Sequence, residues 1–109
     1  MYIYNVTINI EESVHKEWIT WMKSHISEVL NTGRFLSAKL TQVLVDEEMG
    51  GVTYSVQYTA ATREDLDDYY KYDADKLRND GLKKFADKML TFRTELKVIN
   101  EFFPMVASN

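Results

Sequence analysis

His25 is the side chain in this sequence best suited to acid–base chemistry, because an imidazole with a pKa near ~6.5 exchanges protons at neutral pH. It follows Trp21 by four positions and precedes Val29 by four, so on a helix it lies on or beside their apolar stripe. There His25 could act as an acid or base on a ligand held between helix and sheet. The alternative is a histidine at the edge of the core, hydrogen-bonded to a backbone carbonyl or a tyrosine. The sequence leaves both interpretations open.

The aromatic side chains are the second group that could build a ligand site. The sequence contains seven tyrosines and two tryptophans, and a tyrosine ring can line a pocket while its hydroxyl bonds to a ligand. Tyr54, Tyr58 and Trp21 are the candidate pocket residues on this argument. Burial of the same rings in the core is the alternative, and it accounts for most of the tyrosines.

Arg93 and Glu95 stand two residues apart on an expected strand, so both side chains point to the same side of it. Arg93 could hold an anionic ligand through its forked N–H donors. It could instead pair with Glu95 of a neighbouring strand or subunit. We favour the ion pair.

The signatures of several catalytic and metal sites are absent from the sequence. It has no glycine-rich phosphate loop, no closely spaced histidine and carboxylate ligands, and no cysteine. The acidic run 64–68 lacks the alternation and the glycine of a calcium loop. We therefore expect no cofactor and no metal site.

Length and composition predict one globular domain over residues 1–109. A chain of 109 residues that is 45% hydrophobic and 28% charged can bury a core without disulfides or metals. The net charge of −4 disfavours nucleic acid as a partner, because phosphate binding depends on Lys and Arg. No apolar run approaches the ~20 residues of a membrane span, and no signal peptide precedes the strand-like start. Because the chain also has no cysteine, we expect a cytoplasmic protein.

Four stretches alternate between apolar and polar residues with the period of two that predicts β-strands. They are Tyr2–Ile10, Phe35–Val45, Val52–Ala60 and Met89–Ile99. Apolar residues at three- and four-residue spacing predict a helix that starts near Ser13 and stops at Gly33. Thr62 is expected to cap a second helix, which the segment 79–81 interrupts.

The remaining segments are predicted as loops. Two adjacent glycines, Gly50 and Gly51, accept positive φ and therefore predict a hairpin turn between the second and third strands. The tail 103–109 is expected to be loosely ordered.

This order predicts an α+β fold, the ferredoxin-like βαββαβ arrangement, with a four-stranded antiparallel sheet and two helices on one face. In the last strand we expect Phe92 and Leu96 to face the helices. The opposite face carries small uncharged polar side chains, which can form hydrogen bonds when partly desolvated. We expect two copies to pair through it as a homodimer, although a face in contact with water is the alternative. The expected dimer face comprises Asn5, Thr7, Thr53, Ser55, Gln57, Arg93 and Glu95.

Several strings in the chain resemble a bacterial family of domains of unknown function. They are Met1–Thr7, Trp18–Met22, His25–Ile26, Val43–Asp46, Gly50–Tyr58 and Phe92–Leu96, and the resemblance covers roughly residues 1–100. More distantly, the layout is similar to the dimeric α/β-barrel superfamily, which implies two ferredoxin-like subunits with paired sheets. That superfamily includes cofactor-free monooxygenases and isomerase-like enzymes. His25-Ile26 is similar to a His-hydrophobic-Pro feature of some branches, but Ser27 replaces the proline here.

Two functions follow as hypotheses. The favoured one is a homodimeric binding or structural module. The alternative is a small cofactor-independent enzyme, isomerase-like or monooxygenase-like, in which His25 carries a proton in a pocket that holds a small-molecule ligand. A third hypothesis, binding of single-stranded RNA on the open sheet, needs exposed aromatic residues for base stacking. The expected outward side chains are Thr, Ser, Gln and Asn, so we set this hypothesis aside.

Overall fold

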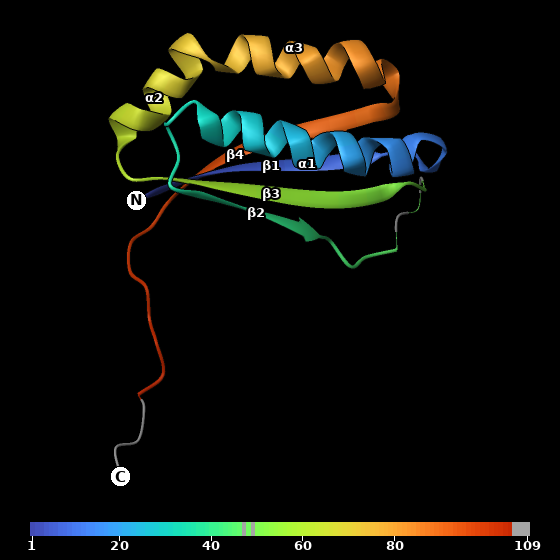
Figure 1. The fold of residues 1–109 in the computed structure, drawn as a ribbon. Helices are drawn as coiled ribbons and strands as arrows, with labels where there is room; N and C mark the ends of the chain where they lie inside the picture. Colours follow the sequence, from blue (N-terminus) through green and yellow to red (C-terminus); the bar gives the residue numbers. More distant parts are fainter. Residues whose placement is uncertain (47, 49, 106–109) are drawn as a thin grey trace.

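The structure is a computed structural model that describes residues 1–46, 48 and 50–105. Its sheet contains four antiparallel strands in the order β2-β3-β1-β4. They are β1 (Tyr2–Ile10), β2 (Ser37–Gln42), β3 (Val52–Ala60) and β4 (Met89–Lys97). This is the predicted ferredoxin-like order, in which the first and third strands occupy the centre and the helices cover one face (Figure 1).

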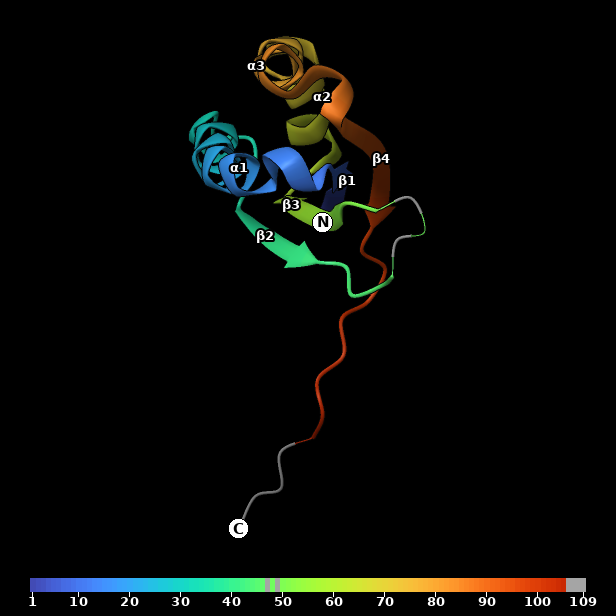
Figure 2. The same ribbon diagram turned by 90° about the vertical axis from the view of Figure 1, so that its right-hand side faces the viewer.

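Three helices lie on one side of the sheet (Figure 2). They are α1 (His15–Asn31), α2 (Arg63–Tyr72) and α3 (Ala74–Phe85), with short 3-10 turns η1 (Glu12–Val14) and η2 (Ala86–Lys88) beside them. The predicted cap of the second helix is confirmed, because the Thr62 hydroxyl accepts a hydrogen bond from the Asp65 N–H at 3.1 Å. The predicted start at Ser13 is wrong. Ser13 lies inside η1, and α1 begins two residues later without a side-chain cap.

The second helical segment is interrupted, but not at the predicted position. The break falls at Asp73, between α2 and α3, and α3 then runs through 79–81 without interruption. Arg34, in the loop before β2, donates from its Nε to the Asp73 carboxylate at 3.0 Å and so fastens this break to the rest of the domain.

The core lies between the helices and one face of the sheet. Even-numbered residues of β1 and β3 point into it, as the alternation predicted, and they meet apolar side chains of the helices. The residues that form this core are Tyr4, Val6, Ile8, Ile10, Trp18, Met22, Val29, Phe35, Tyr54, Val56, Tyr58, Ala60, Leu66, Tyr69, Ala74, Leu77 and Phe85.

Strand β4 has the opposite orientation to the predicted one. Arg93 pairs with Val6, and Glu95 pairs with Tyr4, so both charged side chains lie on the helix side of the sheet. Their predicted place on the dimer face is therefore wrong, as is the predicted inward direction of Phe92 and Leu96. The physical reason is register: opposed residues of an antiparallel pair share a face, and β1 fixes β4 from end to end.

The open face of the sheet, meaning the face without helices, has two parts. Its centre is polar, and cross-strand hydrogen bonds join Asn9 to Thr53 at 3.1 Å and Ser55 to Asn5 at 2.6 Å. Its β4 side is apolar. Leu90, Phe92 and Leu96 form a row there, with exposed fractions of 56%, 65% and 42%.

The chain beyond β4 leaves the sheet on the side opposite the helices (Figures 1 and 2). Residues 103–105 of the predicted tail have no regular secondary structure and are exposed; the rest of the tail lies outside the described residues. The predicted hairpin turn has positive φ at Gly50 and Gly51, while positions 47 and 49 also lie outside the described residues. Within the described part of the chain, no helix is long and apolar enough to cross a membrane.

Candidate functional site

A cavity of about 50 Å³ lies between the helices and the β4 side of the sheet. Its wall combines apolar side chains with a few polar groups. The residues that line it are Tyr4, Val6, Ile8, Trp21, Met22, His25, Tyr58, Tyr69, Leu77, Arg78, Gly81, Met89, Thr91 and Arg93. Since one water molecule needs ~10–15 Å³, a cavity of this volume has room for roughly four water-sized groups.

His25 lies at this cavity, as predicted for a ligand site, and it projects from α1. Its ring stacks on Trp21 with 4.6 Å between centroids and 19° between planes. Nδ1 of His25 is buried and has no hydrogen-bond partner among the described residues. Burial lowers the pKa of His25, and the carboxylates of Glu28 and Asp80 partly oppose this shift. A neutral imidazole with a free ring nitrogen can accept or donate a proton.

The Tyr4 hydroxyl is the meeting point of two arginines. Arg78, from α3, donates to it from a terminal guanidinium nitrogen at 2.9 Å, and Arg93, from β4, donates to it from Nε at 3.1 Å. The guanidinium of Arg78 also lies over the ring of Tyr70, 5.8 Å from its centroid. Two cations thus converge on one neutral oxygen.

Within the described part of the chain, no carboxylate oxygen lies within 4.0 Å of the side-chain nitrogens of Arg78 or Arg93. Nε of Arg78 is also buried without a hydrogen-bond partner among those residues. Buried polar groups in proteins are normally satisfied, so an unsatisfied guanidinium nitrogen at a cavity wall indicates a place for an acceptor.

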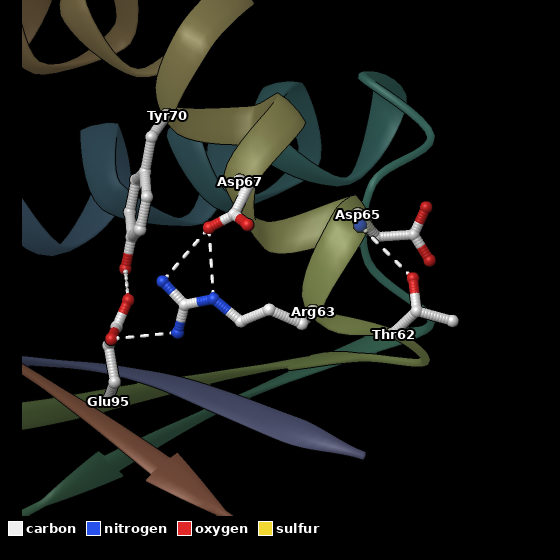
Figure 3. A network of polar contacts seen from close by, with 6 residues as sticks. All are labelled: Thr62, Arg63, Asp65, Asp67, Tyr70 and Glu95. Carbon is white, nitrogen blue, oxygen red and sulfur yellow. Dashed lines mark hydrogen bonds and ion pairs between the residues drawn. The ribbon is translucent and has the colours of Figure 1, made fainter.

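Glu95 is the next inward-facing residue of β4 after Arg93, but its partners are on α2 (Figure 3). It accepts from Arg63 at 2.9 Å and from the Tyr70 hydroxyl at 2.6 Å, while Arg63 also pairs with Asp67 at 2.9 Å. These hydrogen bonds, the one from Arg63 most strongly, hold the pKa of Glu95 below its ordinary value. The favoured pairing of Arg93 with Glu95 is not made within the chain.

The structure separates the three predicted pocket aromatics. Trp21 and Tyr58 line the cavity with His25, and burial raises the pKa of Tyr58 far above its ordinary value. Tyr54 lies elsewhere, against Trp18, and its hydroxyl is 2.6 Å from Nε2 of His15. The placement of Tyr54 in this pocket is therefore wrong.

Sequence reasoning missed Arg78 and the hydroxyl of Tyr4 as site residues. Arg78 occupies a helix and is separated from Tyr4 by 74 positions, and Arg93 by 89. No local pattern connects residues so far apart. The available signal was the position of Arg78 beside Leu77, a residue of the inward stripe.

Comparison with known proteins places the chain in a family. A family model described as a domain of unknown function, DUF4286, matches residues 1–99. The chain belongs to the DUF4286 family. No curated protein matches this DUF4286 domain.

Solved structures similar to the DUF4286 domain share its fold at low sequence identity. A dimeric ferredoxin-like protein from an uncultured marine organism has a TM-score of 0.70 and 14% identity, over 93% of this chain and 97% of that one. A protein from Deinococcus radiodurans named as an antibiotic biosynthesis monooxygenase has a TM-score of 0.63 and 10% identity, over 97% of this chain and 100% of that one. The hydroxynitrile lyase of Passiflora edulis has a TM-score of 0.60 and 17% identity, over 94% of this chain and 97% of that one.

Proposed function

We propose that this DUF4286 domain is a homodimeric binding module. Two copies pair through the open face of the sheet, and each copy holds a small ligand in the cavity beside His25. The observation that carries the proposal is the apolar row of Leu90, Phe92 and Leu96, which projects from a folded sheet into solvent. Apart from Ile3 and Lys39, the other strand residues of this face are uncharged and polar. Large exposed apolar side chains that are grouped on one face are typical of interaction sites.

The polar centre of the open face is suited to burial against a second copy. Its side chains already bond to one another, as in the pairs Asn9–Thr53 and Ser55–Asn5, so covering them leaves few unsatisfied groups. The structure describes all the strand residues of this face, and among them the charged residue is Lys39. Desolvation of the face therefore costs far less than desolvation of a face covered with charges.

The expected dimer residues Asn5, Thr7, Thr53, Ser55 and Gln57 keep their place in this proposal, and the β4 row replaces Arg93 and Glu95. The tail beyond β4 leaves the sheet on this same side (Figures 1 and 2). Its exposed apolar residues include Ile99, Phe102 and Phe103. The similar protein from the marine organism is named a dimer, which supports the same arrangement here.

Light scattering coupled to gel filtration tests the dimer. The chain has a mass of 12.8 kDa, so a homodimer elutes with about twice that mass. We expect Phe92→Lys to give monomers, because it places two like charges in a desolvated layer. Leu82→Lys is the matched control, since Leu82 is similarly exposed but lies on α3, across the domain. A monomeric wild-type protein at micromolar concentration, or equal dissociation by both variants, contradicts the proposal.

A second candidate function rests on Nδ1 of His25, which has no hydrogen-bond partner among the described residues. A half-buried imidazole at a cavity, with a pKa lowered by burial, could transfer a proton to or from a bound molecule, as in a cofactor-independent isomerase or monooxygenase. Some fold neighbours carry enzyme names, including a lyase and a monooxygenase. For this candidate, His25→Ala must keep the fold, measured by circular dichroism, and must abolish turnover of any substrate found. Turnover that persists in His25→Ala removes His25 from the mechanism.

The remaining features of the proposal concern location and partners. We propose a cytoplasmic protein that binds neither nucleic acid nor membranes. The negative net charge and the cysteine-free sequence are compatible with this.

A further inference from the structure

We propose that the cavity is an anion site, in which Arg78, Arg93 and the Tyr4 hydroxyl bind the carboxylate group of a small organic acid. The inference deepens the ligand-binding half of the proposed function and is independent of dimerisation. The proposed ligand is a small carboxylate. Two of the residues that recognise it, Arg78 and Tyr4, were not predicted as site residues, whereas an anionic ligand was one of the two predicted partners of Arg93.

The hydrogen-bond arithmetic at Tyr4 is the first argument. A phenolic hydroxyl has two acceptor lone pairs and one donor hydrogen. Arg78 and Arg93 donate to its oxygen at 2.9 and 3.1 Å, so both lone pairs are occupied. The hydrogen of Tyr4 must then point away from both guanidinium groups, where it is available to a further acceptor.

The unused donors of the arginines point to the same kind of ligand. Nε of Arg78 is buried without a partner among the described residues, and arginine has donors but no acceptor. Arg93 also keeps terminal N–H groups that make no ion pair with a described carboxylate. The polar side of the cavity is therefore dominated by donors, and what satisfies it is an acceptor.

The charges around the cavity favour an anion as this acceptor. Two guanidinium groups share one neutral oxygen, and their positive charges repel each other at short range. The neighbouring carboxylate, Glu95, is neutralised by Arg63 and bonded by Tyr70. Glu28 and Asp80 act on His25 through space, yet neither lies within 4.0 Å of a nitrogen of Arg78 or Arg93. An anion between the two arginines relieves their repulsion.

The small cavity and the planar guanidinium groups together favour a carboxylate as this anion. About 50 Å³ accommodates roughly four water-sized groups, which is the number of heavy atoms in acetate. A planar carboxylate also matches the planar fork of a guanidinium in bidentate geometry. Arg93 is an exposed residue, so the rest of a larger acid can extend past it into solvent.

Acetate is the probe for the test, and acetamide is its uncharged control of the same shape. We expect acetate to raise the melting temperature of the wild-type protein at constant ionic strength, with a dissociation constant of about 1 mM or weaker for so small a ligand. Acetamide must leave the melting temperature unchanged. Equal effects of acetate and acetamide overturn the proposal, as does a stronger effect of inorganic phosphate than of acetate.

Variants assign the binding to the two arginines. Arg78→Gln and Arg93→Gln should each weaken acetate about tenfold or more, because each removes a charge-assisted hydrogen bond. Lys83→Gln is the matched control: it removes one positive charge from α3, the helix that carries Arg78, but Lys83 is exposed and does not line the cavity. Equal weakening in all three variants indicates general attraction of anions and overturns the site.

A measurement on the wild-type protein keeps the test valid if a variant fails to fold. In ¹⁵N-labelled protein, acetate should shift the Nε–H resonances of Arg78 and Arg93 and leave that of Arg63 in place. Absence of these shifts overturns the anion site. Because the same sample reports its mass by light scattering, failure of the anion site and failure of the dimer are seen separately.

Discussion

Trp21 of α1 and Gly81 of α3 lie so close together that a Cβ built on Gly81 would be 3.0 Å from Cη2 of Trp21. The Trp21 ring has little freedom to withdraw, because His25 stacks on it at 4.6 Å and Phe85 meets it edge-on at 5.3 Å. The glycine therefore sets how closely α1 and α3 approach above the cavity. This explains a glycine in the interior of a helix, where it is otherwise unfavourable.

Gly81→Ala should reduce the stability of the protein. In an exposed helix this change gains about 1 kcal/mol of helix propensity, but crowding a packed site costs about 1–3 kcal/mol. We expect a net loss of up to about 2 kcal/mol in the free energy of unfolding, measured by urea denaturation. Asn79→Ala is the control, since it is exposed on the same helix and should be neutral or slightly stabilising. A stabilised Gly81→Ala variant shows that Trp21 can move.

The two glycines of the β2–β3 connection offer a matched pair. Both have positive φ, +80° at Gly50 and +82° at Gly51, so alanine is strained at either position, by about 1–2 kcal/mol. A Cβ on Gly50 meets nothing within 4 Å, whereas one on Gly51 would lie 2.8 Å from the carbonyl oxygen of Ile10. Gly51→Ala should therefore cost about 1–3 kcal/mol more than Gly50→Ala in thermal or urea unfolding. Equal losses mean that the end of β1 yields to the methyl group.

The strand order and the inward faces of β1 and β3 could be predicted from the sequence because those strands alternate cleanly. The same pattern misled for β4. Alternation states that Leu90 and Phe92 share one face and Arg93 the other, but not which face the helices cover. At an edge strand such as β4, the long side chain of an arginine can reach a cavity on the helix side. The apolar residues then face away from the helices, where a partner could cover them.

The contacts that were not predictable join residues far apart in the chain. The helix break is fixed by Arg34 and Asp73, which are 39 positions apart. The sequence predicted a helix interruption at Gly81, because glycine is unfavourable inside a helix. The reason for the glycine is its close contact with Trp21, which is a tertiary contact that the local sequence does not indicate. For the site, Trp21 and His25 could be inferred from helical spacing and Tyr58 from strand alternation. The arginine pair at Tyr4 could not, because it needs the registration of three elements.

Replacing Ala86 by glycine should stabilise the protein. It follows α3 with φ +38° and ψ −117°, a conformation that a side chain with a Cβ rarely adopts. Relief of this strain, about 1–2 kcal/mol, exceeds the entropy cost of glycine, about 0.5–1 kcal/mol. We expect Ala86→Gly to raise the free energy of unfolding by up to about 1 kcal/mol. Ala86→Val should lower it, and the opposite order of the two variants contradicts the assigned backbone strain.

His25 should make the protein less stable in mild acid. Burial lowers its pKa in the folded state, while the unfolded chain keeps the ordinary value near ~6.5. As the pH falls below that value the unfolded state binds a proton that the folded state does not, so the free energy of unfolding decreases until the folded pKa is reached. Between about pH 7.5 and about pH 5.5, His25→Gln should lose less stability than the wild type in thermal unfolding. His15→Gln tests whether this effect belongs to His25, and an unchanged pH dependence in His25→Gln would show that the imidazole is not desolvated.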